Sequence, residues 1–134
     1  MGTRDITPWL TVPVALEFMG TVLPGGWDEV RARNHALVVE ARNLLVETLN
    51  ITPPCPDAML GSLAALHLPE IKALKPSVAT SALGLDPIQE ALFHDHKIEV
   101  PVLVCPESGG RIFRVSAQLY NTIDDYARLA KALQ

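Results

Sequence analysis

The stretch of residues 111–129 constrains the fold more than any other part of the chain. Residues 111–116 alternate in character as a β-strand does, and the polar residues that follow predict a loop. Thr122 and Asp125 then have the spacing of a capping box, which predicts the start of the last helix. The strand carries Arg114 at a position where an apolar residue would be cheaper to bury. A strand, a loop and a capped helix in succession predict a domain that mixes strands and helices.

Two helices are predicted before this stretch. Thr7 and Pro8 have the pattern of an N-cap followed by a first-turn proline, which predicts a short helix through Trp9 to about Gly20, strained or restarted at Pro13. Residues 27–49 predict the longest helix, because apolar residues recur at helical spacing and acidic residues occupy the first turn. A helix of more than 20 residues is long for a chain of 134, so we expect it to connect two domains.

The rest of the chain predicts strands separated by loops and one further helix. Residues 58–68 are apolar on both alternating faces, which predicts a strand covered on both sides. Residues 97–105 alternate cleanly, and Pro101, which lacks an N–H, places that strand at an edge. The remaining segments are a stiff linker over 51–57, a loop or irregular helix over 70–84, a capping box at Asp86–Gln89 that opens a helix to about His96, a hairpin turn over 107–110, and a last helix to Leu133.

This order predicts an α+β domain of two layers, in which a small antiparallel sheet of about three strands has helices packed on one face. A long connecting helix precedes the sheet. We expect residues 1–50 to form a helical connector and residues 51–134 to form the α+β domain.

Composition excludes several classes of function. Hydrophobic residues make up 49% of the chain and charged residues 19%, which is typical of a globular protein. The net charge of −4 leaves no basic surface for nucleic acid, and no apolar run is long enough to span a bilayer. Cys55 and Cys105 lack the spacing of a metal site, so the simplest interpretation is a reduced, cytoplasmic protein without a membrane partner.

Arg114 has two interpretations from chemistry alone. The favoured one is a structural arginine at the rim of the sheet, with its stem on apolar surface or its charge paired with a nearby carboxylate. The other is a guanidinium held on a rigid strand, where its fork of donors binds a substrate carboxylate through two parallel hydrogen bonds.

Metal binding and thiol chemistry are both disfavoured. His94 and His96 are two residues apart and so do not share a helix face, and no third ligand lies near them in the sequence. We therefore expect no metal site, and we expect His35 and His67 to be structural. Cys105 ends an apolar strand beside a proline with no histidine next to it, so nothing nearby would activate its thiol.

The chain resembles the C-terminal part of the class V aminotransferase family, with its closest likeness to the isopenicillin N epimerase-like branch. The resemblance rests on the opening residues 2–9 (GTRDITPW) and on RVSAQLYNT at 114–122. It implies the small domain of fold-type I pyridoxal-phosphate enzymes. It also implies that Arg114 binds the α-carboxylate of an amino-acid substrate, and that Thr3 binds the phosphate of the partner subunit's pyridoxal phosphate.

The resemblance further implies that most of the catalytic machinery lies outside this chain. Pyridoxal-phosphate chemistry needs a Schiff-base lysine, an aspartate at the pyridinium nitrogen and a phosphate cradle, which family members carry upstream of the Gly-Thr pair. None of Lys72, Lys75, Lys97 and Lys131 matches that lysine. We expect a missing N-terminal cofactor-binding domain, a homodimer in the full-length enzyme, and no cofactor or catalysis in this chain alone.

Two alternatives stay open beside the epimerase. One is a non-catalytic module that dimerises or binds a small carboxylate, from a truncated gene. The other is the small domain of a class V cysteine desulfurase or lyase, against which the setting of Cys105 argues. A domain separated from its partner should expose the apolar segment 9–18 and self-associate.

Overall fold

The computed structural model describes residues 5–70, 84–105 and 109–134. It divides into two compact units, one ending at Arg33 and the other running from Asn34 to Gln134. The elements in chain order are the helices α1 (Thr7–Thr21) and α2 (Gly26–Leu49), the short 3₁₀ helix η1 (Asp57–Met59), the strand β1 (Leu63–Leu68), the helix α3 (Pro87–His96), the strands β2 (Val102–Val104) and β3 (Arg111–Ser116), and the helix α4 (Ile123–Ala132).

The first unit consists of α1 and the start of α2. The sequence had predicted Thr7 as the N-cap of α1, but Ile6 occupies that position. The Asp5 carboxylate accepts a hydrogen bond from the Thr7 N–H at 2.9 Å. The helix runs through Pro13 without restarting. No residue of α1 is buried, and Trp9 is 78% exposed, so the helix presents its apolar side chains to solvent. Self-association through this segment stays a prediction.

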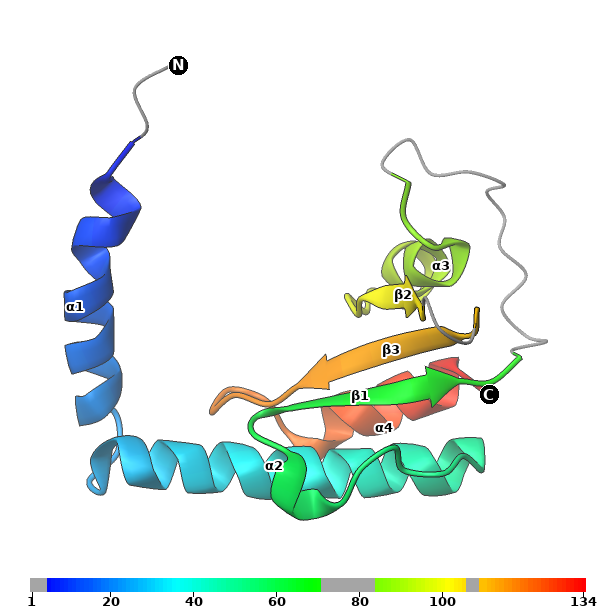
Figure 1. Ribbon diagram of the computed structural model, residues 1–134, viewed down its shortest axis with the longest axis horizontal. Helices are drawn as coiled ribbons and strands as arrows, with labels where there is room; N and C mark the ends of the chain where they lie inside the picture. The colour runs from blue at the N-terminus through cyan, green and yellow to red at the C-terminus, as the bar shows by residue number, and fades with distance from the viewer. Residues whose placement is uncertain (1–4, 71–83, 106–108) are drawn as a thin grey trace. The chain divides into compact units, whose positions relative to one another are not determined.

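The second unit has the predicted α+β architecture. Its three strands form an antiparallel sheet in the order β1-β3-β2, so β3 is central and β2 lies at an edge, as Pro101 had predicted. The register pairs Phe113 of β3 with Leu66 on one side and Val102 on the other. Figure 1 shows α2 and α4 on the same side of this sheet.

The core lies on that side of the sheet. Phe113 and Val115 are 1% and 3% exposed, and they alternate with exposed neighbours. β1 alternates in the same way, so the prediction that it is covered on both sides was wrong: its second face, which includes Ala65 and His67, is exposed in this chain. The helices contribute Val38 and Leu45 from α2, Leu92 from α3, and Leu129 and Ala130 from α4.

Three of the predicted details need correction. The strand predicted over 58–68 forms only over β1, because residues 57–59 form the 3₁₀ helix η1. The alternating residues 97–105 form a strand only over β2, and Lys97 takes a left-handed conformation (φ 57°) that ends α3. Asp86 caps α3 by accepting from the Ile88 N–H at 2.9 Å, yet Gln89 does not complete the capping box. Its side-chain oxygen accepts instead from the Val102 N–H at 2.8 Å, which fastens α3 to the edge strand.

The other predicted elements are present. The helix over 27–49 corresponds to α2, the strand over 111–116 to β3, and Thr122 and Asp125 form both hydrogen bonds of the predicted capping box of α4. The expected loop or irregular helix over 70–84 and part of the hairpin turn fall on residues 71–83 and 106–108, outside the described residues. The division into a connector over 1–50 and a domain over 51–134 concerns a longer protein and stays a prediction.

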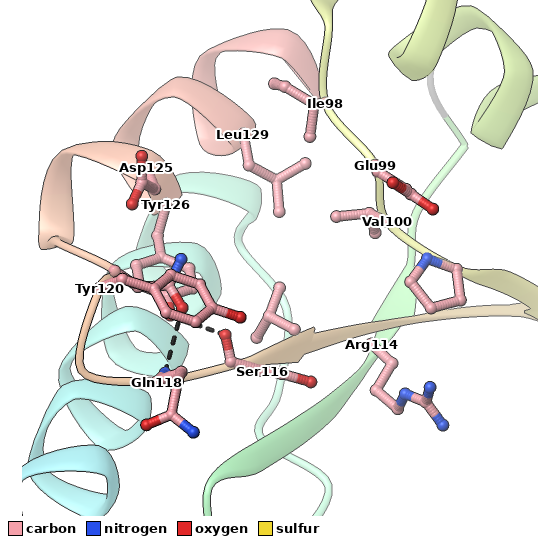
Figure 2. Close-up of a pocket in the computed structure, with 13 residues that line it drawn as sticks. Ile98, Glu99, Val100, Arg114, Ser116, Gln118, Tyr120, Asp125, Tyr126 and Leu129 are labelled. Atoms are coloured by element: carbon pink, nitrogen blue, oxygen red, sulfur yellow. Dashed lines mark hydrogen bonds between the residues drawn. The ribbon is translucent and has the colours of Figure 1, made fainter. Parts of the chain in front are cut away.

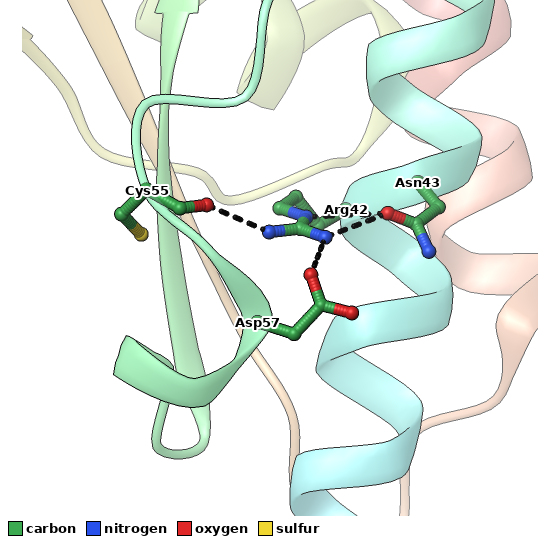
Figure 3. Close-up of polar contacts among 4 residues, drawn as sticks. All are labelled: Arg42, Asn43, Cys55 and Asp57. Carbon is green, nitrogen blue, oxygen red and sulfur yellow. Dashed lines mark hydrogen bonds and ion pairs between the residues drawn. The ribbon is translucent and has the colours of Figure 1, made fainter.

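Arg42 holds the segment after α2 against that helix. Its side chain is only 5% exposed, although it is charged. Figure 3 shows its guanidinium donating to the Cys55 carbonyl at 3.0 Å, to the Asn43 side chain at 2.8 Å and to the Asp57 carboxylate. A buried guanidinium is tolerable because its donors are occupied in this way.

No helix in the described parts of the chain is long and apolar enough to cross a membrane.

We predict that Arg42→Ala lowers the free energy of unfolding by about 2–3 kcal/mol, because it removes charged hydrogen bonds from a buried position. Denaturant-induced unfolding followed by circular dichroism measures the change. Asp57→Asn is the matched control. The Asp57 side chain is 57% exposed, so removing its negative charge should lower the free energy of unfolding by less than about 1 kcal/mol. Equal effects of the two substitutions would contradict this account.

Candidate functional site

A pocket of about 260 Å³ lies in the second unit where three segments meet. Residues 98–101, which precede β2, form one wall, and residues 114–116 of β3 form another. The 117–122 loop between β3 and α4 contributes Gln118, Tyr120 and Asn121, and α4 contributes Asp125, Tyr126 and Leu129. The pocket thus combines polar groups with apolar surface, as small-molecule sites do.

Arg114 lines this pocket from the middle of the sheet. Its backbone N–H donates to the Pro101 carbonyl at 3.2 Å, and it pairs with Ala65 of β1, so neighbours hold its backbone on both sides. Its side chain leaves the exposed face of β3, and Figure 2 shows the guanidinium directed away from Tyr120 and Asp125. Within the described residues the guanidinium has no ion-pair partner, so the expected local carboxylate is not found there.

Two carboxylates share the pocket with Arg114. Asp125 is engaged, because it accepts the Thr122 N–H at 3.0 Å as part of the α4 capping box. Glu99 is exposed and lines the opposite wall. The residues that line the pocket thus include a cation, Arg114, and an exposed carboxylate, Glu99.

The 117–122 loop explains the Tyr120-Asn121-Thr122 run in structural terms. The Asn121 side chain accepts from the Gln118 N–H at 3.0 Å, and its own N–H donates to the Gln118 carbonyl at 2.8 Å. Thr122 caps α4. Asn121 and Thr122 thus shape the loop, while Tyr120 is 83% exposed and lines the pocket.

Sequence reasoning missed the anchor of this loop. Asn34 of α2 is 5% exposed, and its side-chain amide donates to the Gln118 side-chain oxygen at 3.1 Å. A polar residue at helical spacing from the buried Val38 and Ala41 is the signal that could have found it.

Tyr126 is a buried residue that lines the pocket. It is 5% exposed, and its hydroxyl donates to the Ser116 carbonyl at 2.8 Å. Burial raises the pKa of Tyr126 above the ordinary value of 10.0, and the negative charge of Asp125 adds to the rise. The phenol is therefore a structural donor between α4 and β3.

The described residues do not by themselves fit a pyridoxal-phosphate site. Thr3, the predicted phosphate ligand, lies outside the described residues, as do Lys72 and Lys75. The Lys97 ammonium donates to the His94 carbonyl at 2.7 Å, and neither Lys97 nor Lys131 lines the pocket. Among its described lining residues the pocket thus has an arginine but no lysine that could form a Schiff base.

The histidine pair lies at the end of α3, and Cys105 follows β2. His94 stacks edge-on against Phe93, with ring centroids 5.2 Å apart, and no group of three His, Cys, Asp or Glu side chains among the described residues could hold a metal ion. The Cys105 backbone bonds Gly109 and Gly110, which places this residue at the closed end of the β2–β3 hairpin.

Comparison with known proteins finds relatives along nearly the whole chain, although no family model matches it. The chain is 34% identical to "Probable L-cysteine desulfhydrase, chloroplastic" of Arabidopsis thaliana, over 99% of this chain and 28% of the relative. It is also 34% identical to isopenicillin N epimerase from Amycolatopsis lactamdurans, over 99% of this chain and 30% of the relative, and from Streptomyces clavuligerus, over 98% and 30%.

The chain resembles a small domain of these class V enzymes. It spans about 30% of the length of the curated relatives that it matches. The predicted likeness to the epimerase-like branch is confirmed, and the desulfhydrases stand beside it at the same identity.

We predict that the stability contributed by Tyr126 disappears at high pH. Because the pKa is raised in the folded state, the unfolded chain ionises first, so the free energy of unfolding falls as pH rises above about 10. Tyr126→Phe should lower stability by about 1 kcal/mol at pH 7 and reduce this fall. Unfolding curves of both proteins from pH 7 to 11 test it, with Tyr120→Phe as the exposed control. An identical pH profile for Tyr126→Phe and the parent would refute the assignment.

Proposed function

We propose that this chain is the C-terminal small domain of a pyridoxal-phosphate enzyme of the class V aminotransferase kind, in which it binds the substrate carboxylate. The observation that carries the proposal is Arg114, which lines the pocket, leaves the exposed face of the central strand and has no ion-pair partner among the described residues. The likeness to an epimerase and a desulfhydrase over about 30% of their lengths supports it.

The position of Arg114 on a strand that is paired on both sides suits carboxylate binding. The central strand is paired on both sides, and Phe113 and Val115 anchor it in the core. A guanidinium on such a strand keeps its orientation, and its fork of donors matches the two oxygens of a carboxylate. Arg114 would therefore orient the amino acid, and the exposed Glu99 and Tyr120 would bound its other groups.

The cofactor would be held by another part of a longer protein. Bound pyridoxal phosphate supplies an electron sink for chemistry at the α-carbon of an amino acid. The lysine, aspartate and phosphate cradle that it needs would lie outside this chain, as would the partner subunit to which Thr3 would reach. This chain alone is expected to bind no cofactor and to be inactive.

Two reaction types follow from the relatives. Epimerisation of an amino acid is the leading one, because the sequence pattern resembles the isopenicillin N epimerase-like branch and two relatives carry that name. Breakdown of L-cysteine is the second, because the desulfhydrase of Arabidopsis thaliana is equally similar. Both act on amino acids, and both are compatible with an arginine that holds the α-carboxylate.

The first experiment is the intact mass of the native protein that contains this sequence. A product several times heavier than 14.6 kDa with an absorbance band from bound cofactor is expected. Assays for racemisation of amino acids and for sulfide release from L-cysteine then separate the two reactions. A native product of 14.6 kDa without cofactor would refute the enzyme proposal and favour a non-catalytic dimerisation or carboxylate-binding module.

We predict that Arg114→Ala in the complete enzyme raises KM for the amino acid by orders of magnitude, because a charge-assisted pair at a binding site is worth about 2–5 kcal/mol. Steady-state kinetics measure the change. Arg114→Lys is the matched control: it keeps the charge but loses the fork, so it should fall between the parent and the alanine variant. An unchanged KM in Arg114→Ala would remove this residue from the site.

A further inference from the structure

The pocket depends on a hydrogen-bonded link between α2 and the 117–122 loop. The Asn34 amide donates to the Gln118 side-chain oxygen at 3.1 Å, and the same oxygen accepts the Leu119 N–H at 2.8 Å. This oxygen therefore joins a helix in the core to the backbone of the loop.

The chemistry of the link fixes the orientation of both amides. A backbone N–H can only donate, so the atom of Gln118 that faces Leu119 must be the oxygen. That oxygen then requires a donor from Asn34, which must present its NH₂ group. Substituting Gln118 would leave the buried Asn34 amide without its acceptor, and substituting Asn34 would leave the Gln118 oxygen with only the bond from Leu119.

Burying the polar side chain of Asn34 costs folding free energy unless its amide is hydrogen-bonded. It lies on the same face of α2 as Val38 and Ala41, both 0% exposed, where an apolar side chain would pack without needing a partner. Its bond spans 84 positions in the sequence and ends in the loop that carries Tyr120. Asn34 therefore ties this loop to the helix that packs against the sheet.

The loop supplies much of the wall of the pocket that contains Arg114. Gln118, Tyr120 and Asn121 all line it, and Asn121 is bonded to Gln118 in turn. A shift of Gln118 would move the exposed phenol of Tyr120 and open the wall opposite residues 98–101. The bond between Asn34 and Gln118 thus controls the shape of a pocket that Asn34 itself does not line.

We propose that Asn34 is a positioning residue for the carboxylate site: through Gln118 it holds the 117–122 loop, and so Tyr120, in place at the pocket that Arg114 also lines. The inference rests on the proposed carboxylate-binding role of Arg114. Asn34 acts through the loop and touches no ligand.

The test is a titration of the full 134-residue chain with acetate at constant ionic strength, followed by ¹⁵N NMR, which yields both the affinity and amide exchange rates. Asn34→Ala should weaken acetate binding by up to about fivefold, because the loss of one hydrogen bond can lower the population of the positioned loop by at most about that factor. Amide exchange at Leu119 should quicken while exchange in β3 stays unchanged. Asn34→Leu, which keeps the helix packed, should do the same if the alanine variant folds poorly.

A control in the same helix separates positioning from general stability. Leu45 is 0% exposed and does not line the pocket, so Leu45→Ala should destabilise the chain without weakening acetate binding below the unfolding temperature. Equal weakening by Leu45→Ala, or acetate affinity at the parent level in both Asn34 variants, would overturn the inference.

Arg114→Ala distinguishes this failure from failure of the site itself. If Arg114→Ala abolishes acetate binding while the Asn34 variants bind normally, the carboxylate site stands and the positioning role is wrong. If Arg114→Ala binds acetate as the parent does, the carboxylate site is wrong and the positioning role falls with it.

Discussion

The pairing of β3 between its two neighbours is the constraint on which the rest of the structure depends. Because side chains alternate along a strand, one register places Phe113 and Val115 in the core and Arg114 on the opposite face. A slip by one residue would bury the guanidinium and expose the phenyl ring, at a cost of several kcal/mol. The packing that stabilises the domain therefore also selects the face on which the arginine appears. Fold and candidate site are two consequences of one register.

The second constraint comes from the polar residues that α2 buries. Arg42 fixes the segment that leaves the helix, and Asn34 fixes the loop that borders the pocket. Both side chains are nearly fully buried. Arg42 donates a hydrogen bond to the irregular backbone at Cys55, and Asn34 donates one to Gln118, which is distant in the sequence. Apolar contacts hold helices and sheets together without specifying the path of a loop, because they lack direction. Directed hydrogen bonds from a rigid helix supply that specification.

Sequence patterns predicted the elements well and their tertiary partners poorly. The capping box of α4 was predictable because both partners are three residues apart and their bonds are local. At α3 the same pattern predicted a capping box that is incomplete, because the Gln89 side-chain oxygen accepts from the Val102 N–H of the edge strand. The exposed face of β1 was missed since its apolar residues are equally consistent with a covered strand. Arg42 and Asn34 were missed for a related reason: helical periodicity assigns polar residues to the surface unless their distant partners are known.

The equal sequence identity of this chain to an epimerase and to a desulfhydrase has a physical explanation. Every α-amino acid carries the same carboxylate, whatever happens afterwards at its α-carbon, so a domain that holds this group can serve several reactions. The features that would select one reaction are those that place acids and bases near the α-carbon, and no lysine is among the described residues that line the pocket. Glu99 and Tyr120 line the same pocket. If Arg114 binds the carboxylate, this chain should therefore influence which amino acids are accepted more than what is done to them, and kinetic changes caused by substitutions here should appear in KM before they appear in kcat.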